Sequence, residues 1–200
     1  MNNIIFDLGN VLFLFNNDAL TAACDVDEKD LRLVSDTVYD RLYWDRLDDG
    51  SISDEEVKEA VCKRLPERLR EKACLVFDSW IKNMPPVEGM HELVADLKKQ
   101  GKKIWLISNI SDRFAKTWMN YPHIERTLSL FDGLVFSGEV KLAKPDTRIF
   151  SYLLEKYSLD SSDCIFIDDT LKNIKGAESV GIKGYLFDGN ADLLRQTLIP

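Results

Sequence analysis

Residues suited to phosphate chemistry occur in four short segments that lie far apart in the chain. The segments are Asp7-Leu8-Gly9-Asn10-Val11, Ser108-Asn109, Lys144-Pro145-Asp146, and Asp168-Asp169 with Asn173. Lys144 offers a positive charge for a phosphate, while Ser108 and Asn109 offer a hydroxyl and amides, groups that position a phosphoryl group and stabilise its charge. Each segment alone is equally compatible with a structural role in a turn or cap. The four together indicate one site.

The carboxylates in these segments favour a bound divalent cation. Two carboxylates about 4 Å apart repel by about 4 kcal/mol at an effective dielectric constant of about 20, so Asp7, Asp168 and Asp169 would be unstable side by side alone. Mg²⁺ prefers oxygen ligands and is usually held by one or two carboxylates plus substrate phosphate. Asp7 can then give one oxygen to Mg²⁺ and attack phosphorus with the other, forming an aspartyl phosphate that water hydrolyses.

Short apolar runs place these residues at the ends of predicted strands. The runs cover residues 3–7, 103–108, 133–137, 163–168 and 183–188, and helical periodicity or turns separate them. Strands that alternate with helices predict an α/β fold with a doubly wound parallel sheet. Ligands of such sheets bind at the carboxyl ends of the strands, where Asp7, Ser108 and Asp168 fall.

Residues 18–83 break this rhythm and predict three or four amphipathic helices instead of strands. Ser53 and Glu56 form a capping-box pattern, which marks a helix start. Pro85-Pro86 ends the stretch, and a helix over 88–100, ended by Gly101, resumes the α/β pattern. We therefore predict an α/β domain made of residues 1–14 and 84–200, with residues 15–83 inserted as a helical cap.

Composition narrows the classes of partner and the cellular compartment. The 200 residues carry a formal charge of −8 and are 45% hydrophobic, which suits a folded domain and argues against binding to nucleic acid or to an anionic membrane. No signal-peptide pattern and no run of roughly 18 apolar residues is present. The four cysteines lack metal-finger spacing, so we expect a cytoplasmic protein. Its oligomeric state stays open between a monomer and a weak dimer.

These segments resemble the haloacid dehalogenase superfamily of aspartate-nucleophile phosphotransferases, over essentially the whole chain. The resemblance implies a Mg²⁺-dependent phosphatase with a cap inserted after the first strand. It assigns the further metal ligands to the Gly9 carbonyl and Asp169, with Asp168 binding directly or through water. The sequence is most similar to small phosphatases acting on glucose 1-phosphate, and less so to the lipid-phosphatase domain of soluble epoxide hydrolases. The expected partner is a small phosphorylated metabolite such as a hexose 1-phosphate.

One position departs from the pattern of that superfamily. Most of its phosphatases carry a second Asp two residues after the nucleophile as general acid and base, whereas this chain has Gly9. Such catalysis is typically worth about a hundred- to ten-thousand-fold in rate. Metal-bound water, a cap carboxylate such as Asp18, or a substrate with an easy leaving group can each compensate.

In the cap, Tyr43, Trp44 and Arg46 are candidate substrate contacts, because aromatic rings and a guanidinium could line a sugar pocket. Aromatic residues at helical spacing are more often core, so at least one of these is expected to be buried.

Two other functions remain open. A phosphate-binding or regulatory module with impaired catalysis would explain Gly9, and a metal-independent haloacid dehalogenase would share the fold and Asp7. The paired carboxylates Asp168 and Asp169 disfavour the dehalogenase, because a metal-free halide site has no use for them.

Overall fold

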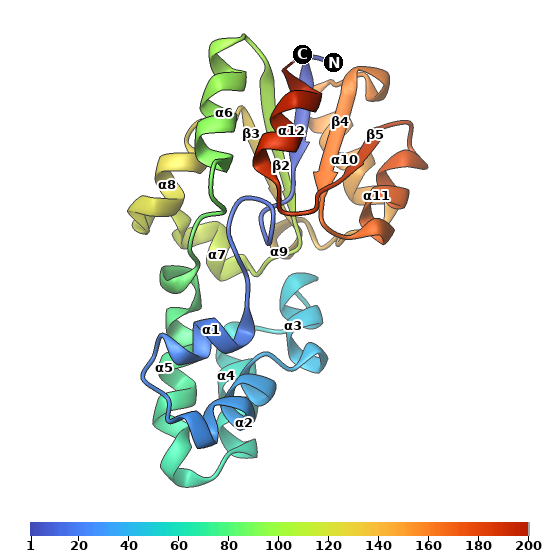
Figure 1. Cartoon of the computed structure of the whole chain (residues 1–200). Helices are drawn as coiled ribbons and strands as arrows, with labels where there is room; N and C mark the ends of the chain where they lie inside the picture. The colour runs from blue at the N-terminus through green and yellow to red at the C-terminus, as the bar shows by residue number, and fades with distance from the viewer. Residues whose placement is uncertain (200) are drawn as a thin grey trace.

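The computed structural model describes residues 1–199 and contains five parallel strands in one sheet (Figure 1). Their order is β3-β2-β1-β4-β5. The strands are β1 (Asn3–Phe6), β2 (Lys103–Ser108), β3 (Gly133–Phe136), β4 (Cys164–Asp168) and β5 (Lys183–Leu186). The chain runs from β1 outward through β2 and β3, then returns to the other side of β1 for β4 and β5. This reversal creates a switch point beside β1, where open α/β sheets bind ligands, and the predicted fold is confirmed.

Both faces of the sheet are buried by helices, as continuous apolar runs in the strands require. On one face, Ile4 and Phe6 belong to a core that includes Leu93 of α6 and Leu194 of α12. On the other face, Ile5 belongs to a separate core with residues of α10 and α11. The helices of the α/β part are α6 (Met90–Lys99), α7 (Asp112–Thr117), α8 (Pro122–Leu128), α9 (Ser137–Val140), α10 (Thr147–Tyr157), α11 (Leu171–Glu178) and α12 (Ala191–Leu198), with short 3₁₀ turns at Trp118–Asn120 and Ser161–Asp163.

Five helices, one more than the largest number expected, lie between β1 and α6. They are α1 (Asn17–Ala22), α2 (Glu28–Val38), α3 (Arg41–Asp48), α4 (Asp54–Arg64) and α5 (Glu67–Asn83). Figure 1 shows them beyond the carboxyl ends of the strands. The capping box is confirmed, because Ser53 N donates to Glu56 Oε2 (2.9 Å) and Glu56 N donates to Ser53 Oγ (3.2 Å). Helices α1 and α3 are too short for their periodicity to separate them clearly from their neighbours.

An aromatic cluster joins these helices to the sheet. Trp44 of α3 contacts Trp80 of α5 with ring centroids 5.4 Å apart, and Trp80 stacks on Phe114 of α7 at 6.0 Å. All three rings are buried within the core that also contains Ile4 and Phe6 of β1. One apolar core therefore runs through both parts, and the division at residues 15 and 84 stays a prediction.

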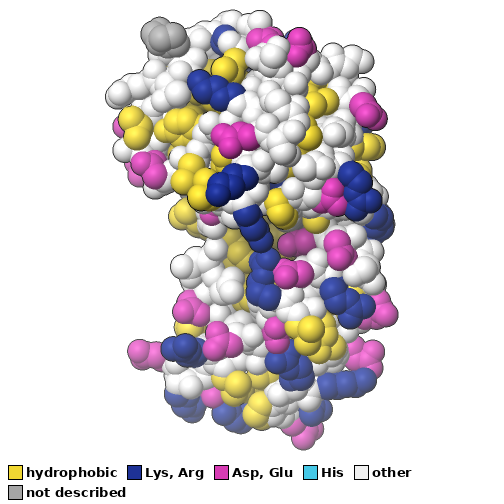
Figure 2. Space-filling view, turned by 90° about the vertical axis from the view of Figure 1, so that its right-hand side faces the viewer, with side chains coloured by type: hydrophobic (Ala, Val, Ile, Leu, Met, Phe, Trp, Pro, Cys, Tyr) yellow, Lys and Arg dark blue, Asp and Glu magenta, His cyan; other side chains and the backbone are white. Residues whose placement is uncertain are grey.

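Charges of both signs are interspersed over the face of the molecule seen in Figure 2, which has no extended basic surface. Within residues 1–199, no helix has the length and apolar character needed to cross a membrane. All four cysteines are free thiols.

Candidate active site

The carboxyl ends of three neighbouring strands bring three of the predicted site residues together. Asp7 directly follows β1, Ser108 ends β2 and Asp168 ends β4. Asp7 N donates to Ile167 O at 2.9 Å, which extends the β1–β4 pairing by one residue. That register places Asp7 beside Asp168, so the two carboxylates meet because the strands are parallel and in step.

Lys144 lies between these two carboxylates. Its Nζ is 2.7 Å from Asp7 Oδ1 and 2.7 Å from Asp168 Oδ2, and the lysine side chain is only 1% exposed. Asn109 holds the lysine backbone in place: Lys144 N donates to Asn109 Oδ1 (2.7 Å) and Asn109 Nδ2 donates to Lys144 O (2.8 Å). Asn109 thus uses its whole side-chain amide as a clamp, and only its backbone remains for a phosphate.

Burial sets the protonation of this group. It raises the pKa of Asp7 to about 7, against the opposing attraction of Lys144 and with a further increase from the charge of Asp168. Burial alone would lower the pKa of Lys144, but the charges of Asp7 and Asp168 raise it instead. The lysine is therefore a firm cation, whereas Asp7 needs more positive charge nearby to stay ionised at neutral pH.

The third carboxylate belongs to Asp169. Oxygens of Asp7, Asp168 and Asp169 lie within 4.8 Å of one another. Asp168 is fixed by Thr170 N (2.8 Å) and by Asn173 Nδ2, while Asp169 is exposed and accepts from Asn10 Nδ2 at 3.2 Å. One ammonium among three carboxylates leaves two negative charges uncompensated. The donor set therefore fits a hard divalent cation.

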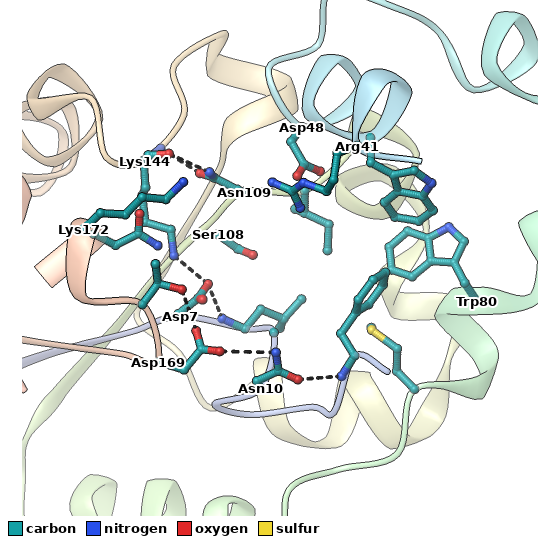
Figure 3. A pocket seen from close by; sticks show the side chains of 18 residues that line it. Asp7, Asn10, Arg41, Asp48, Trp80, Ser108, Asn109, Lys144, Asp169 and Lys172 are labelled. Atoms are coloured by element: carbon teal, nitrogen blue, oxygen red, sulfur yellow. Dashed lines mark hydrogen bonds and ion pairs between the residues drawn. The ribbon is translucent and has the colours of Figure 1, made fainter. Parts of the chain in front are cut away.

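These groups form the floor of a cavity of about 340 Å³ (Figure 3). The polar part of its lining includes Asp7, Gly9, Asn10, Ser108, Asn109, Lys144, Asp169, Lys172 and Asn173 on the floor side, with Arg41 and Asp48 from α3 on the other. Apolar side chains close another wall: Phe15, Trp44, Trp80 and Met84. The cavity can therefore hold a charged group at the floor and an apolar or mixed body above it.

The haloacid dehalogenase-like hydrolase family model matches residues 1–181, and its description agrees with the sheet and the floor described above. The chain belongs to this family.

Individual relatives of this hydrolase are distant. A sesquiterpene phosphatase of Aspergillus oryzae is 27% identical over 180 residues, covering 90% of this chain and 86% of that protein. A drimenol cyclase of Aspergillus calidoustus is 28% identical over 96% of this chain, but the chain spans only 35% of the cyclase. A haloacid dehalogenase family enzyme of Bacteroides thetaiotaomicron, solved with magnesium and inorganic phosphate, has a TM-score of 0.69 at 21% identity, covering 95% of this chain and 96% of that one. The structural likeness shows the shared fold.

Residues from all four predicted segments lie together at the floor of one cavity.

Of the three substrate contacts predicted on α3, only one lines the cavity. Trp44 is buried and lines the cavity, but Tyr43 packs against the Arg64 guanidinium (5.6 Å from the ring centroid), and Arg46 is exposed. Neither Tyr43 nor Arg46 lines the cavity, because both lie on other faces of the helix, so a substrate role for them has no support from the geometry.

Sequence reasoning overlooked Arg41 and Asp48, which line the cavity with Trp44. The three residues are spaced by three and four positions and so share one face of α3. The sequence predicts that these three residues share a helix face. It does not predict that this face points to the site, because the orientation of α3 depends on its packing against α9.

Proposed function

We propose that this hydrolase removes phosphate from a small phosphomonoester in a Mg²⁺-dependent reaction, with Asp7 as the nucleophile. The arrangement of charged side chains on the cavity floor supports this proposal. A buried lysine lies 2.7 Å from both Asp7 and Asp168, and Asp169 completes a carboxylate group able to hold a metal. Such a site joins a nucleophile, a phosphate-binding cation and a metal-binding group at one point.

Asp7 is oriented for attack by its neighbours. Its Oδ1 accepts from Leu8 N (2.7 Å) and from Lys144 Nζ, which together fix the plane of the carboxylate. Within residues 1–199, Oδ2 of Asp7 receives no hydrogen bond, so it is the oxygen available to attack phosphorus. Ser108 and the backbone amide of Asn109 then receive the phosphate oxygens, and Lys144 balances their charge.

Asp7, Asp169, the Gly9 carbonyl and Asp168, directly or through water, would hold the Mg²⁺. When bound, this ion screens the repulsion between the carboxylate and the phosphate and lowers the pKa of Asp7 into the ionised range.

For the substrate, we propose a hexose 1-phosphate or a related sugar phosphate. The similarity to glucose-1-phosphate phosphatases supports it, and so does a phosphorylated carbohydrates phosphatase of Thermotoga maritima, 26% identical over 64% of this chain. Arg41 and Asp48 in the cavity wall suit sugar hydroxyls. The anomeric oxygen of a sugar 1-phosphate leaves easily, which would also reduce the need for a general acid at position 9.

A second candidate is a phosphate ester with an apolar body, such as a prenyl phosphate. Its support is the aromatic wall of Phe15, Trp44 and Trp80 together with the relative that is a sesquiterpene phosphatase. The two candidates differ in the group that would contact this aromatic wall, a sugar ring in one and a prenyl chain in the other.

A panel of sugar phosphates, prenyl phosphates and p-nitrophenyl phosphate, each with Mg²⁺, tests both the reaction and the substrate class. We expect phosphate release that stops with EDTA and in Asp7→Asn. Asp36→Asn, an exposed aspartate of α2, is the matched control and should behave as wild type. Phosphate release that persists in Asp7→Asn would disprove the nucleophile. No release from any substrate, with vanadate still bound in a metal-dependent way, would favour the binding module.

A further inference from the structure

Because Gly9 has no group that can protonate the leaving oxygen, this proton has to come from another group at the cavity. Asp18, a candidate from the sequence, is unsuitable: it is exposed on α1, accepts a hydrogen bond from Ser35 Oγ (2.6 Å) and does not line the cavity. Among the described residues, the cavity wall above the floor contains one carboxylate, that of Asp48.

Asp48 is placed opposite the nucleophile. It ends α3 and lines the same cavity as Asp7, and Figure 3 shows it across the open space from Asp7 and Asp169. In an in-line displacement the leaving oxygen departs on the side away from the attacking one. Throughout residues 1–199, no hydrogen bond engages the carboxyl oxygens of Asp48, which leaves them free for a substrate atom.

Contacts to Ser137 and Lys141, at the two ends of α9, hold the turn at Asp48 in position. Ser137 Oγ donates to Asp48 O and accepts from Ile110 N at 2.8 Å, so one buried hydroxyl joins the end of α3 to the loop that follows β2. Lys141 Nζ donates to Gly50 O at 2.9 Å. Gly50 has φ +69°, and a Cβ there would lie 2.1 Å from Lys141 Nζ. The turn is thus docked tightly enough to fix Asp48 relative to Asp7.

The environment of Asp48 also favours a protonated carboxyl near neutral pH. Burial raises its pKa to about 7, helped by the charges of Asp45 and Asp7 and opposed by Arg41 and Lys144. A general acid works best when its pKa lies near the working pH.

We infer that Asp48 is the general acid and base of this hydrolase, an inference that rests on the function proposed above. In the first step Asp7 forms a bond to phosphorus, the ester P–O bond breaks, and the carboxyl proton of Asp48 passes to the leaving oxygen. In the second step the Asp48 carboxylate takes a proton from water as that water attacks phosphorus, which releases the Asp7 carboxylate and phosphate. Asp48 is protonated again at the end.

The test compares an alkyl phosphate with p-nitrophenyl phosphate, whose leaving group needs no proton. In Asp48→Asn we expect turnover of the alkyl phosphate to fall about a hundred- to ten-thousand-fold. With p-nitrophenyl phosphate we expect a rapid burst of one equivalent of p-nitrophenolate followed by slow turnover, because the aspartyl phosphate forms but lacks a base for hydrolysis. Asp49→Asn is the matched control, since an Asn carbonyl can keep the hydrogen bond that Asp49 Oδ1 accepts from Ser51 N (2.8 Å).

Several results would overturn the inference. Alkyl phosphate turnover within about three-fold of wild type would show that Asp48 transfers no proton. Equal losses in the burst and in both turnover rates, with an unchanged melting temperature, would assign Asp48 to substrate positioning. A wild-type protein that releases phosphate from no substrate would instead contradict the proposed function, so the two failures are distinguishable.

Discussion

The floor of the cavity and the α3 wall opposite it are built in different ways. On the floor, the side chains of Lys144, Asp168 and Asp7 are 1%, 0% and 11% exposed, and each is bound by its neighbours. On the α3 wall, Arg41 is exposed and Asp48 has no hydrogen bond to its carboxyl oxygens among the described residues. We infer that the floor holds the reacting groups in place and that burying these charges lowers the stability of the fold. Residues of α3 instead determine proton transfer and substrate choice.

The largest effect is expected for Lys144→Met, which removes the cation that lies between two buried carboxylates. Breaking a buried ion pair from one side typically costs about 3–5 kcal/mol, and loss of a charge-stabilising donor costs roughly a hundred- to thousand-fold in kcat. Urea unfolding and turnover measure both. Lys172→Met, an exposed lysine at the same cavity, should change the free energy of unfolding by less than about 0.5 kcal/mol. If both variants unfold alike, Lys144 does not stabilise the two buried carboxylates.

The same contrast explains what the sequence could predict. Strands β1, β2 and β4 are short apolar runs followed by polar residues, and parallel strands bring their ends to one edge whatever the details of packing. Asp7, Ser108 and Asp168 were therefore found from the sequence. So was Lys144, although its loop gives no local signal, because the superfamily resemblance includes it.

The α3 wall could not be predicted in this way. Tyr43 and Arg46 were chosen by residue type, but a rotation of about 100° per residue decides which side chains of a helix meet the cavity. The docking of the Asp48–Gly50 turn onto Ser137 and Lys141 sets that rotation. It is a long-range contact that no local sequence pattern encodes.

Gly9→Asp, which introduces a carboxyl group on the floor, should partly restore the turnover that Asp48→Asn loses. A Cβ at Gly9 would meet no atom within 4 Å, so the backbone there has room for a side chain to begin. We expect Asp48→Asn/Gly9→Asp to recover at least about ten-fold in alkyl phosphate turnover, part of the range that acid catalysis supplies. Gly9→Asn on the same background is the control and should recover nothing. Equal turnover in all three variants would mean that the two positions do not serve the same proton transfer.

The pH dependence of kcat/KM for an alkyl phosphate should report the Asp48 carboxyl. Its pKa near 7 is raised, so the proton is present below about pH 7 and lost above it. We expect kcat/KM to fall about ten-fold per pH unit above that value, and this decline to be absent in Asp48→Asn. The charged groups facing Asp48 are Arg41 and Asp45 on α3, with Asp7 and Lys144 on the floor; Lys141 anchors the adjoining turn. A decline that survives in Asp48→Asn belongs to another group.

The smallest effect is expected for Trp44→Phe, which tests the apolar part of the wall without emptying it. Trp44 Nε1 donates to Val38 O at 2.6 Å, and its ring packs against Phe15 and Trp80. Phe keeps most of this packing but loses the hydrogen bond, so the free energy of unfolding should drop by about 1–2 kcal/mol. A ring change of this size should alter relative kcat/KM between a sugar phosphate and a prenyl phosphate by about ten-fold or less, with p-nitrophenyl phosphate unchanged. Within residues 1–199, Trp44 makes no hydrogen bond to a floor residue, so a general loss on all three substrates would show that the wall and the floor are not independent.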